Sequence, residues 1–461
     1  MTAPHVNLIA AANSLRPRVL GGVHTPETSA FDDARSGFQR RATHRPDVVI
    51  VAAGEPDVRA GVELASTFDS TIAVQATGHG LGTPLTGGVL VTTGRLNGVR
   101  VRPDTRTATL QAGATWQDVI DAAAPHGLAP LSGSLPSVGA VSYTLGGGLS
   151  LAARQYGYAA DHVRGLDLVT PDGRSVHVSP DHESDLFWAV RGGGGNFGIV
   201  TEMEIDLFPI SRIYGGSLYF DVAQVPHVLA GWREWTATLP DGMTSGVTMM
   251  PMPDLPALPE VLRGRHVAQV QAVWLGSPQD GEDLVRPLRG LGPVVIDTLR
   301  ELPFSASGSV FDEPTEPHAY ASENLLVSEL DTDALDALPG RSGTSAPALT
   351  VISLRHLGGG LARTPEVPNA VGHRAATHSL TVLNLVDPSV EEATHTLRTE
   401  LTEPFRRHHL GRGLNFSYGF LTPDQVREGY SADDYQRLTH VKARTDPHER
   451  LRANHPIPAA G

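Results

Sequence analysis

The glycine-rich segment at residues 191–200, RGGGGNFGIV, constrains the fold of this chain more than any other stretch. Gly193, Gly195 and Gly198 match the G-x-G-x-x-G fingerprint of a dinucleotide-binding Rossmann unit. Such a unit needs a strand before the glycines and a helix after them, because the helix N-terminus holds the pyrophosphate. Here the preceding residues have helical spacing, and residues 199–207 alternate apolar and polar as a strand does. The sequence therefore excludes a Rossmann unit at this segment.

Composition limits the chemistry that is open to the protein. The 461 residues, 40% of them hydrophobic, are enough for two globular domains or one large one. There is no cysteine, so disulfides, thiolate metal sites and iron–sulfur clusters are excluded, and any redox chemistry needs a bound cofactor. The net charge of −14 argues against a surface for nucleic acid.

Several enzyme classes lack their local signatures. Lys442 is the sole lysine, so no glycine loop is followed by the lysine of a P-loop, and a Schiff base would have to form at this residue. Neither the Gly-x-Ser-x-Gly nor the His-Glu-x-x-His motif occurs. The first residues have no basic region before their mildly apolar segment, and no apolar run reaches membrane-spanning length. We therefore expect a cytoplasmic protein without membrane or nucleic-acid partners.

Hydrophobic patterns predict two regions that differ in secondary structure. Between residues 47 and 209, short apolar strands are separated by glycine loops and by helical patterns, which predicts an α+β or α/β domain. From Ser211 onward the sequence predicts strands such as residues 217–220 and 267–274, and alternation at residues 349–354 and 378–385 predicts an antiparallel sheet with one face covered. A domain boundary is expected between these two parts.

Two loops carry the residues that suggest chemistry. Residues 74–83 follow a strand pattern and place closely spaced backbone amides around His79. Residues 131–148 are dense in small side chains and run on toward Asp161. Because glycines let backbone amides approach an anion without a Cβ in the way, the two loops favour a flat aromatic ligand with a phosphate tail. Alone, a Gly-His pair is more typical of a turn or a hydrogen-bonded core histidine.

Six motifs in order resemble those of flavin-linked oxidases of the berberine bridge enzyme type, in the vanillyl-alcohol oxidase/PCMH superfamily. They are residues 75–79 (QATGH), 134–139 (SLPSVG), 145–148 (LGGG), 154–161 (RQYGYAAD), 185–201, and 446–458 with its Asp-Pro and Asn-x-x-Ile-Pro. The resemblance runs from about residue 45 to the end. It implies an α+β fold with a PCMH-type FAD-binding domain of two subdomains, and a substrate domain whose antiparallel sheet is covered by helices. The boundaries expected are 1–210, 211–413, and a C-terminal segment 414–461 that returns to the FAD-binding domain.

The resemblance also implies FAD as the cofactor, joined through a ring nitrogen of His79 to the flavin 8α-methyl group. Many members add a second bond from a cysteine, where this chain has Leu135, so a single attachment is expected. This change predicts a lower flavin potential than in doubly linked relatives, or a substrate that is easier to oxidise. Gln75 replaces the usual arginine and Thr77 a glycine, so backbone amides are expected to supply more of the pyrophosphate binding.

The motif matches place a larger set of residues against the cofactor, of which Ser142 and Tyr143 replace a frequent Gly-His pair. The set is Gln75, Ala76, Thr77, Gly78, His79, Gly80, Ser134, Leu135, Val138, Gly139, Ser142, Tyr143, Gly146, Gly148, Asp161, Gly195, Gly198, Ile199, Val200, Asn415 and Asn454. No metal ligand set is expected.

The implied reaction moves a hydride from a substrate C–H bond to flavin N5 while a base removes an O–H or N–H proton, and dioxygen then reoxidises the flavin with release of hydrogen peroxide. Relatives carry the base on a strand of the substrate domain or in a Tyr-x-Asn-Tyr segment. That segment aligns with residues 413–416, which keep Asn415 but neither tyrosine. Tyr418, His378 and Asn384 are the other catalytic candidates, and His378 can titrate near neutral pH. The alternative role of each is that of an ordinary core or surface polar residue.

Three functions remain open from the sequence. The first is an oxidase with a single histidyl–FAD bond, acting on a small secondary-metabolite-like alcohol, amine or polycyclic substrate with O2 as acceptor, as a monomer or homodimer. The second is a flavin-containing cyclase with non-redox chemistry, which the loss of the familiar tyrosines keeps open. The third is a dehydrogenase that uses another electron acceptor.

Overall fold

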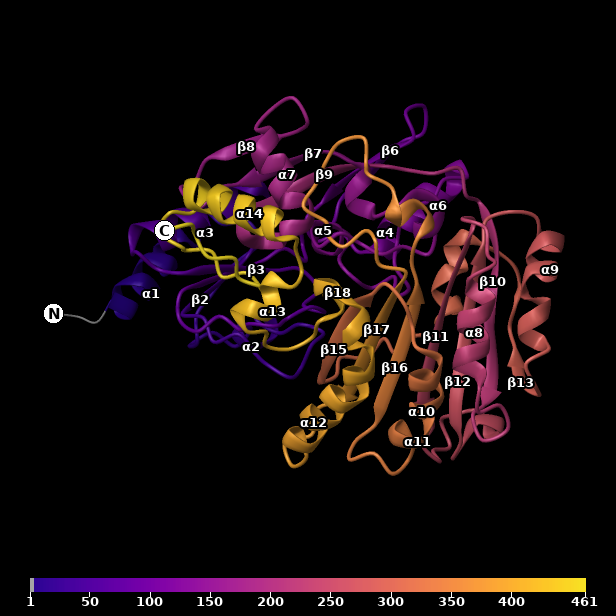
Figure 1. Ribbon diagram of the computed structural model, residues 1–461. Coiled ribbons are helices and arrows are strands. Elements are labelled where there is room, and N and C mark those ends of the chain that lie inside the picture. Colours follow the sequence, from indigo (N-terminus) through magenta and orange to yellow (C-terminus); the bar gives the residue numbers. More distant parts are fainter. Residues whose placement is uncertain (1–3) are drawn as a thin grey trace.

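The computed structural model describes residues 4–461, and the strands of this part of the chain form three sheets (Figure 1). A four-stranded sheet has the order β1-β2-β4-β3, and a five-stranded sheet has the order β5-β6-β9-β7-β8. The third, here called the large sheet, has nine strands in the order β13-β10-β12-β11-β16-β17-β15-β18, with β14 paired to β10. The α+β fold class expected from the sequence is confirmed.

The four-stranded sheet forms because its strands are short apolar runs that are buried almost completely. Its strands are β1 (Val23–His24), β2 (Val48–Val51), β3 (Ile72–Gln75) and β4 (Val89–Thr92). Strands β2, β3 and β4 are parallel, as expected for apolar runs separated by a crossover helix, α3 (Glu55–Thr67). Helices α1 (Pro4–Leu15) and α2 (Phe31–Ala34) pack against this unit, and the loop with His79 begins where β3 ends.

The five-stranded sheet is antiparallel throughout its pairings. Its strands are β5 (Val99–Arg102), β6 (Thr107–Gln111), β7 (Val163–Val169), β8 (Ser175–Val178) and β9 (Ile199–Asp206). The helices beside it are α4 (Trp116–Ala123), α5 (Ala140–Leu145), α6 (Ala153–Tyr156) and α7 (Ser184–Gly193). Helix α7 precedes the glycine segment and β9 follows it, so the exclusion of a Rossmann unit is confirmed.

The large sheet is antiparallel, and helices cover one of its faces (Figure 1). Its strands are β10 (Arg212–Asp221), β11 (Met243–Pro251), β12 (His266–Trp274), β13 (Val294–Asp297), β14 (Arg300–Pro303), β15 (Tyr320–Val327), β16 (Thr350–His356), β17 (His378–Leu385) and β18 (His409–Gly411). The helices of this region are α8 (Val228–Thr236), α9 (Pro278–Arg289), α10 (Thr332–Ala337), α11 (Pro339–Ser342) and α12 (Glu391–Thr402). Apolar side chains from α8, α9, α10 and α12 share a core with alternate residues of the strands.

The C-terminal segment leaves the large sheet and packs on α7. It contains α13 (Pro423–Arg427) and α14 (Ala432–Thr445), and Figure 1 shows α14 lying beside α7. Lys442 on α14 is 2% exposed and donates to Asp446 Oδ2 at 2.6 Å and to the Asn196 carbonyl at 2.9 Å. The only lysine therefore joins the C-terminal helix to the glycine segment. This arrangement supports the domain limits expected from the sequence, which we propose as 1–210, 211–413 and 414–461.

Among the residues that the structure describes, none of the helices has both the length and the apolar character that a membrane span requires.

Candidate active site

His79 lies on the first glycine loop, between two hydroxyl groups. Its Nδ1 is 2.8 Å from Thr77 Oγ1, and its Nε2 is 3.4 Å from Ser137 Oγ of the second loop. The imidazole stacks on the ring of Phe38 with centroids 4.0 Å apart. Burial, with a smaller contribution from the neighbouring His318, lowers the pKa of His79 to about 4. The imidazole is therefore neutral at pH 7 and keeps a nitrogen lone pair.

The second glycine loop lies against the first. The Gly139 amide is 3.4 Å from Thr77 Oγ1, which sets Ser134, Leu135, Val138 and the start of α5 beside His79. The Tyr143 hydroxyl is buried and has no hydrogen-bond partner among the described residues. Gly146 has no room for a side chain, because a Cβ there would overlap the amide of Asn415. The sequence thus brings together two loops that are separated by about fifty residues.

The third glycine segment keeps its main chain open. A Cβ placed on Gly194 would meet no atom within 4 Å, and one on Gly195 would only reach Val74 Cγ1 at 4.0 Å. Gly198 differs, because a Cβ there would lie 2.6 Å from Leu168 Cδ1 of β7. Ile199 and Val200 have buried side chains, so only the main chain of residues 198–200 remains to meet a ligand.

The C-terminal tail joins the first and third glycine segments. Asn454 Oδ1 accepts a hydrogen bond from the Gly82 amide at 3.4 Å, and Nδ2 of the same side chain lies 3.9 Å from the position of a Cβ on Gly80. Asn196 donates to the His455 carbonyl at 3.1 Å. Asn454, predicted from the motif near the end of the chain, is therefore placed beside the loop with His79.

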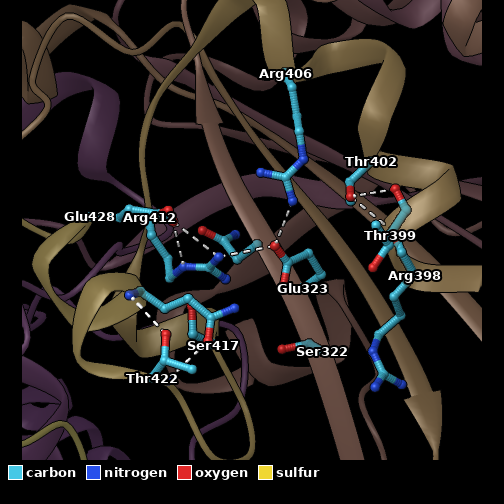
Figure 2. A network of polar contacts seen from close by, with 12 residues as sticks. Ser322, Glu323, Arg398, Thr399, Thr402, Arg406, Arg412, Ser417, Thr422 and Glu428 are labelled. Atoms are coloured by element: carbon cyan, nitrogen blue, oxygen red, sulfur yellow. Dashed lines mark hydrogen bonds and ion pairs between the residues drawn. The ribbon is translucent and has the colours of Figure 1, made fainter. Parts of the chain in front are cut away.

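Residues 413–418 form another wall of the site, and strand β15 fastens them. The Gly413 amide donates to Asn324 Oδ1 at 2.7 Å, and the Tyr418 amide donates to Ser322 Oγ at 2.8 Å. Figure 2 shows a network of ion pairs just before this segment, in which Arg412 pairs with Glu323 and Glu428. Because Arg412 is buried and pairs with two carboxylates, it holds the start of the segment in place.

Asn415 and Tyr418 point from this segment toward the loops. Asn415 donates to the Tyr143 carbonyl at 2.9 Å. The Tyr418 ring packs edge-on against Tyr320 at 4.9 Å between centroids, and the Tyr320 hydroxyl donates to the His79 carbonyl at 2.7 Å. Burial raises the pKa of Tyr418 and the nearby Glu313 carboxylate raises it further, while Arg355 opposes the shift. Tyr418 is therefore protonated at neutral pH and is a hydrogen-bond donor rather than a base.

Sequence reasoning missed four residues around His79: Phe38, Ser137, Glu313 and Tyr320. Arg355, a fifth residue of the site, donates to Ser134 Oγ at 3.3 Å from β16. A period-2 pattern through residues 320–327 is the signal that would have pointed to Tyr320, but its polar residues fall on the site face and obscure it.

His378 and Asn384 lie away from the site, which argues against the catalytic roles expected for them. Both alternate on β17 onto the face that packs against the helices. The His378 ring is 5.6 Å from that of Trp232 on α8. Asn384 is fully buried, donates to Thr350 Oγ1 and accepts from Arg398. Their side chains therefore satisfy polar groups inside the core of the large sheet.

Asp161 also has a different environment from the one expected. Its carboxylate accepts from Arg374 at 2.6 Å, from Asn369 at 2.7 Å and from the Tyr158 amide at 2.9 Å. Because both oxygens are engaged by protein groups, Asp161 holds the segment before β17 in place and has no free contact to offer a ligand.

The residues at these loops fit FAD. A Cβ on Gly194 would meet open space, and one on Gly80 or Gly195 would make a single contact at 3.9 or 4.0 Å, which leaves room beside these glycines for a ligand whose pyrophosphate could be bound by backbone amides. Gln75 Oε1, Ser132 Oγ and the Tyr143 hydroxyl are buried without partners among the described residues, as expected where a polar ligand completes the hydrogen bonding. Within the described residues, no group of acidic and histidine side chains is arranged to hold a metal ion.

Known proteins resemble this chain over nearly its whole length. A family model described as "FAD binding domain" matches residues 46–179. The (R)-6-hydroxynicotine oxidase of Paenarthrobacter nicotinovorans is 27% identical, with 96% of this chain and 98% of that protein covered. Two solved structures share the fold. The berberine bridge enzyme-like protein 1 of Physcomitrella patens has a TM-score of 0.83 at 18% identity, with 99% of each chain covered. The glucooligosaccharide oxidase of Acremonium strictum has a TM-score of 0.84 at 20% identity, with 100% of each covered.

The matched family model covers the first two glycine loops, and the shared fold extends through the large sheet and the C-terminal tail. Together with the open glycine main chain and the histidine beside it, these matches identify the cofactor as FAD. The chain thus contains an FAD binding domain, resembles FAD-linked oxidoreductases over nearly its whole length, and shares the fold of the berberine bridge enzyme-like proteins.

Proposed function

We propose that the protein is an FAD-dependent oxidase with one covalent bond between His79 and the flavin. It takes hydride from a small secondary-metabolite-like alcohol, amine or polycyclic substrate and passes the electrons to O2, which yields H2O2. The observation that carries this proposal is the neutral imidazole of His79, held between Thr77 and Ser137 where the first two glycine loops meet. A neutral imidazole nitrogen is a nucleophile, whereas a protonated one is not.

The chain's own residues hold and orient the reactants. Bound FAD supplies the hydride acceptor and the reaction with oxygen. In this proposal the backbone amides of residues 76–80 bind the pyrophosphate, while Phe38 and Tyr320 fix the ring and the carbonyl of His79. The protonated hydroxyl of Tyr418 would donate a hydrogen bond to a substrate oxygen or nitrogen.

The names of relatives support the oxidase class. The relative from Paenarthrobacter nicotinovorans is a 6-hydroxynicotine oxidase, and the structure from Acremonium strictum is an oligosaccharide oxidase whose FAD is described as 6-S-cysteinyl and 8α-N1-histidyl. This chain has leucine at position 135 and no cysteine, so the proposal includes the histidyl bond alone.

Acid precipitation tests the proposed bond. Yellow colour should stay with the precipitated wild-type polypeptide and should move to the supernatant for His79→Ala. His318→Ala is a matched control, because His318 also contacts Phe38 but is not the proposed attachment site. Retention of flavin by the precipitated His79→Ala protein would place the bond elsewhere.

Two further measurements separate the oxidase from the alternatives. Bleaching of the flavin when substrate is added without oxygen distinguishes redox chemistry from a non-redox cyclase. Peroxide release in air then distinguishes an oxidase from a dehydrogenase with another acceptor.

A further inference from the structure

Arg355 lies where the large sheet meets the second glycine loop. It is on β16 with its side chain on the face opposite the helices, and only 16% of that side chain is exposed. Its Nη2 is 3.3 Å from Ser134 Oγ and 3.3 Å from Glu313 Oε1. A single guanidinium therefore bridges a residue expected at the flavin and a carboxylate from the loop before β15.

These contacts satisfy only part of the hydrogen-bond donors of the Arg355 guanidinium. Charge-assisted N–H to O bonds are usually about 2.7–2.9 Å long, so both bonds of Nη2 are stretched. Arg355 Nε is buried and has no hydrogen-bond partner among the residues described. A guanidinium presents five donors in a planar fork that matches a carboxylate, and within the described part of the chain Nη2 is the nitrogen of Arg355 that has hydrogen-bond acceptors.

The surroundings of Arg355 favour a planar anionic group. Its Cζ is 4.0 Å from the ring centroid of Phe311 and 5.9 Å from that of Phe416, which also lines the cavity containing Asn415. The Tyr143 hydroxyl, which has no partner, is close enough for Arg355 to oppose the burial that raises its pKa. The chain as a whole has a net charge of −14, so a local cation is needed to hold an anion here.

Building on the oxidase function, we propose that Arg355 binds a carboxylate of the substrate and so orients it beside the flavin loops. The substrates are then small organic acids, with an aromatic or polycyclic body that packs against Phe311 and Phe416. Glu313, whose side chain is 35% exposed, takes the place of that carboxylate in the free protein and moves aside when substrate binds.

Benzoate, the simplest aromatic carboxylate, is the probe for this site, and uncharged benzamide is its matched control. We expect benzoate to perturb the visible flavin spectrum of the holoenzyme saturably, and benzamide to have much less effect. Arg355→Ala should weaken benzoate binding at least about tenfold, which is the loss of one charged hydrogen bond. Glu313→Gln should tighten it, because the competing carboxylate loses its charge.

Arg363→Ala is the control variant, because Arg363 also joins the two parts of the protein, through Asp241 and the Gln155 carbonyl, but lies elsewhere. It should bind benzoate as the wild type does. Should Arg355→Ala fail to fold, Arg355→Lys, which keeps the charge but loses the fork, and Glu313→Gln decide the matter. Equal affinity for benzoate and benzamide, or unchanged affinity in the Arg355 and Glu313 variants, would overturn the proposal.

Calorimetry keeps this test separate from that of the oxidase function. A protein without flavin contradicts the oxidase function, while heat of benzoate binding that depends on Arg355 still supports the carboxylate site. A flavin-containing protein with no benzoate binding at millimolar concentration contradicts the carboxylate site alone.

Discussion

The two faces of the large sheet use the same strands for different purposes. Toward the helices the strands present residues such as Val247, Leu354 and Leu380, which are buried in a shared apolar core. Toward the glycine loops they present polar residues such as Asn324 and Arg355. Since successive side chains of a strand point to opposite faces, a strand such as β15 or β16 contributes to both the core and the site.

His79 and His378 show how the environments of the two faces differ. Burial lowers the pKa of His79 to about 4 at the glycine loops, and burial lowers the pKa of His378 to about 3 on the helix-covered face. A lowered pKa is therefore common to both environments. The neighbours differ, because His79 meets hydroxyl groups beside open glycine main chain, whereas His378 meets Trp232 and a second buried histidine, His356.

The largest expected effect is on the helix-covered face. Trp232→Ala removes a fully buried ring whose Nε1 also donates to Ser245 Oγ at 2.9 Å. We expect the free energy of unfolding to fall by about 3–5 kcal/mol, measured by denaturant titration, because a large cavity is left behind. The folded variant should still contain flavin. Loss of the flavin without loss of stability would break the distinction between the two faces.

On the face toward the loops, Tyr418→Phe should leave stability nearly unchanged and reduce activity. We expect kcat/KM to fall by about 10–100-fold, which corresponds to the loss of one hydrogen bond of roughly 1.4–2.8 kcal/mol in the transition state. Tyr219→Phe, a change on the loop-facing side of β10, is the control and should keep full activity. An equal loss in both variants would mean that the site is not organised around Tyr418.

Acid should destabilise the protein through the helix-covered face. The pKa of His378 falls from 6.5 to about 3 and that of His356 falls from 6.5 to about 2, in both cases chiefly through burial. Because these pKa values are lower in the folded than in the unfolded state, their contribution is fully present above pH 6.5 and is lost as the pH falls below it. Each histidine should add about 1.4 kcal/mol per pH unit to the slope of the unfolding free energy between pH 6 and 4. His378→Gln should lower this slope by the contribution of one histidine. An unchanged slope would contradict the lowered pKa of His378.

The smallest effect is expected for Ser353→Ala. Ser353 lies on β16 on the same face as Arg355. Its hydroxyl takes part in none of the hydrogen bonds described above for the site. We expect changes within about 0.5 kcal/mol in stability and little change in benzoate affinity. A large loss of affinity would extend the proposed carboxylate site farther along the strand.

Much of the fold could be predicted from the sequence, because most strands are either apolar runs or clean alternations. Strand β15 could not, since Tyr320, Ser322 and Asn324 occupy one face and include the very groups that serve the site. The glycine loops and Asn454 could be found because their spacing is local. Whether His378 or its neighbours on the other face of the strand serve the site depends on which face of the sheet meets the loops, and period-2 patterning leaves that undetermined.

Because Lys442 is buried, its amine is protected from amine-directed reagents in the folded protein. With its Nζ enclosed by Asp446 and Asn196, the sole lysine of the chain is closed to acylating dyes while the fold is intact. An adduct on Lys442, located by peptide mass, would appear only when α14 separates from the glycine segment. The single lysine is thus a built-in reporter of whether the C-terminal helix remains docked beside the FAD loops.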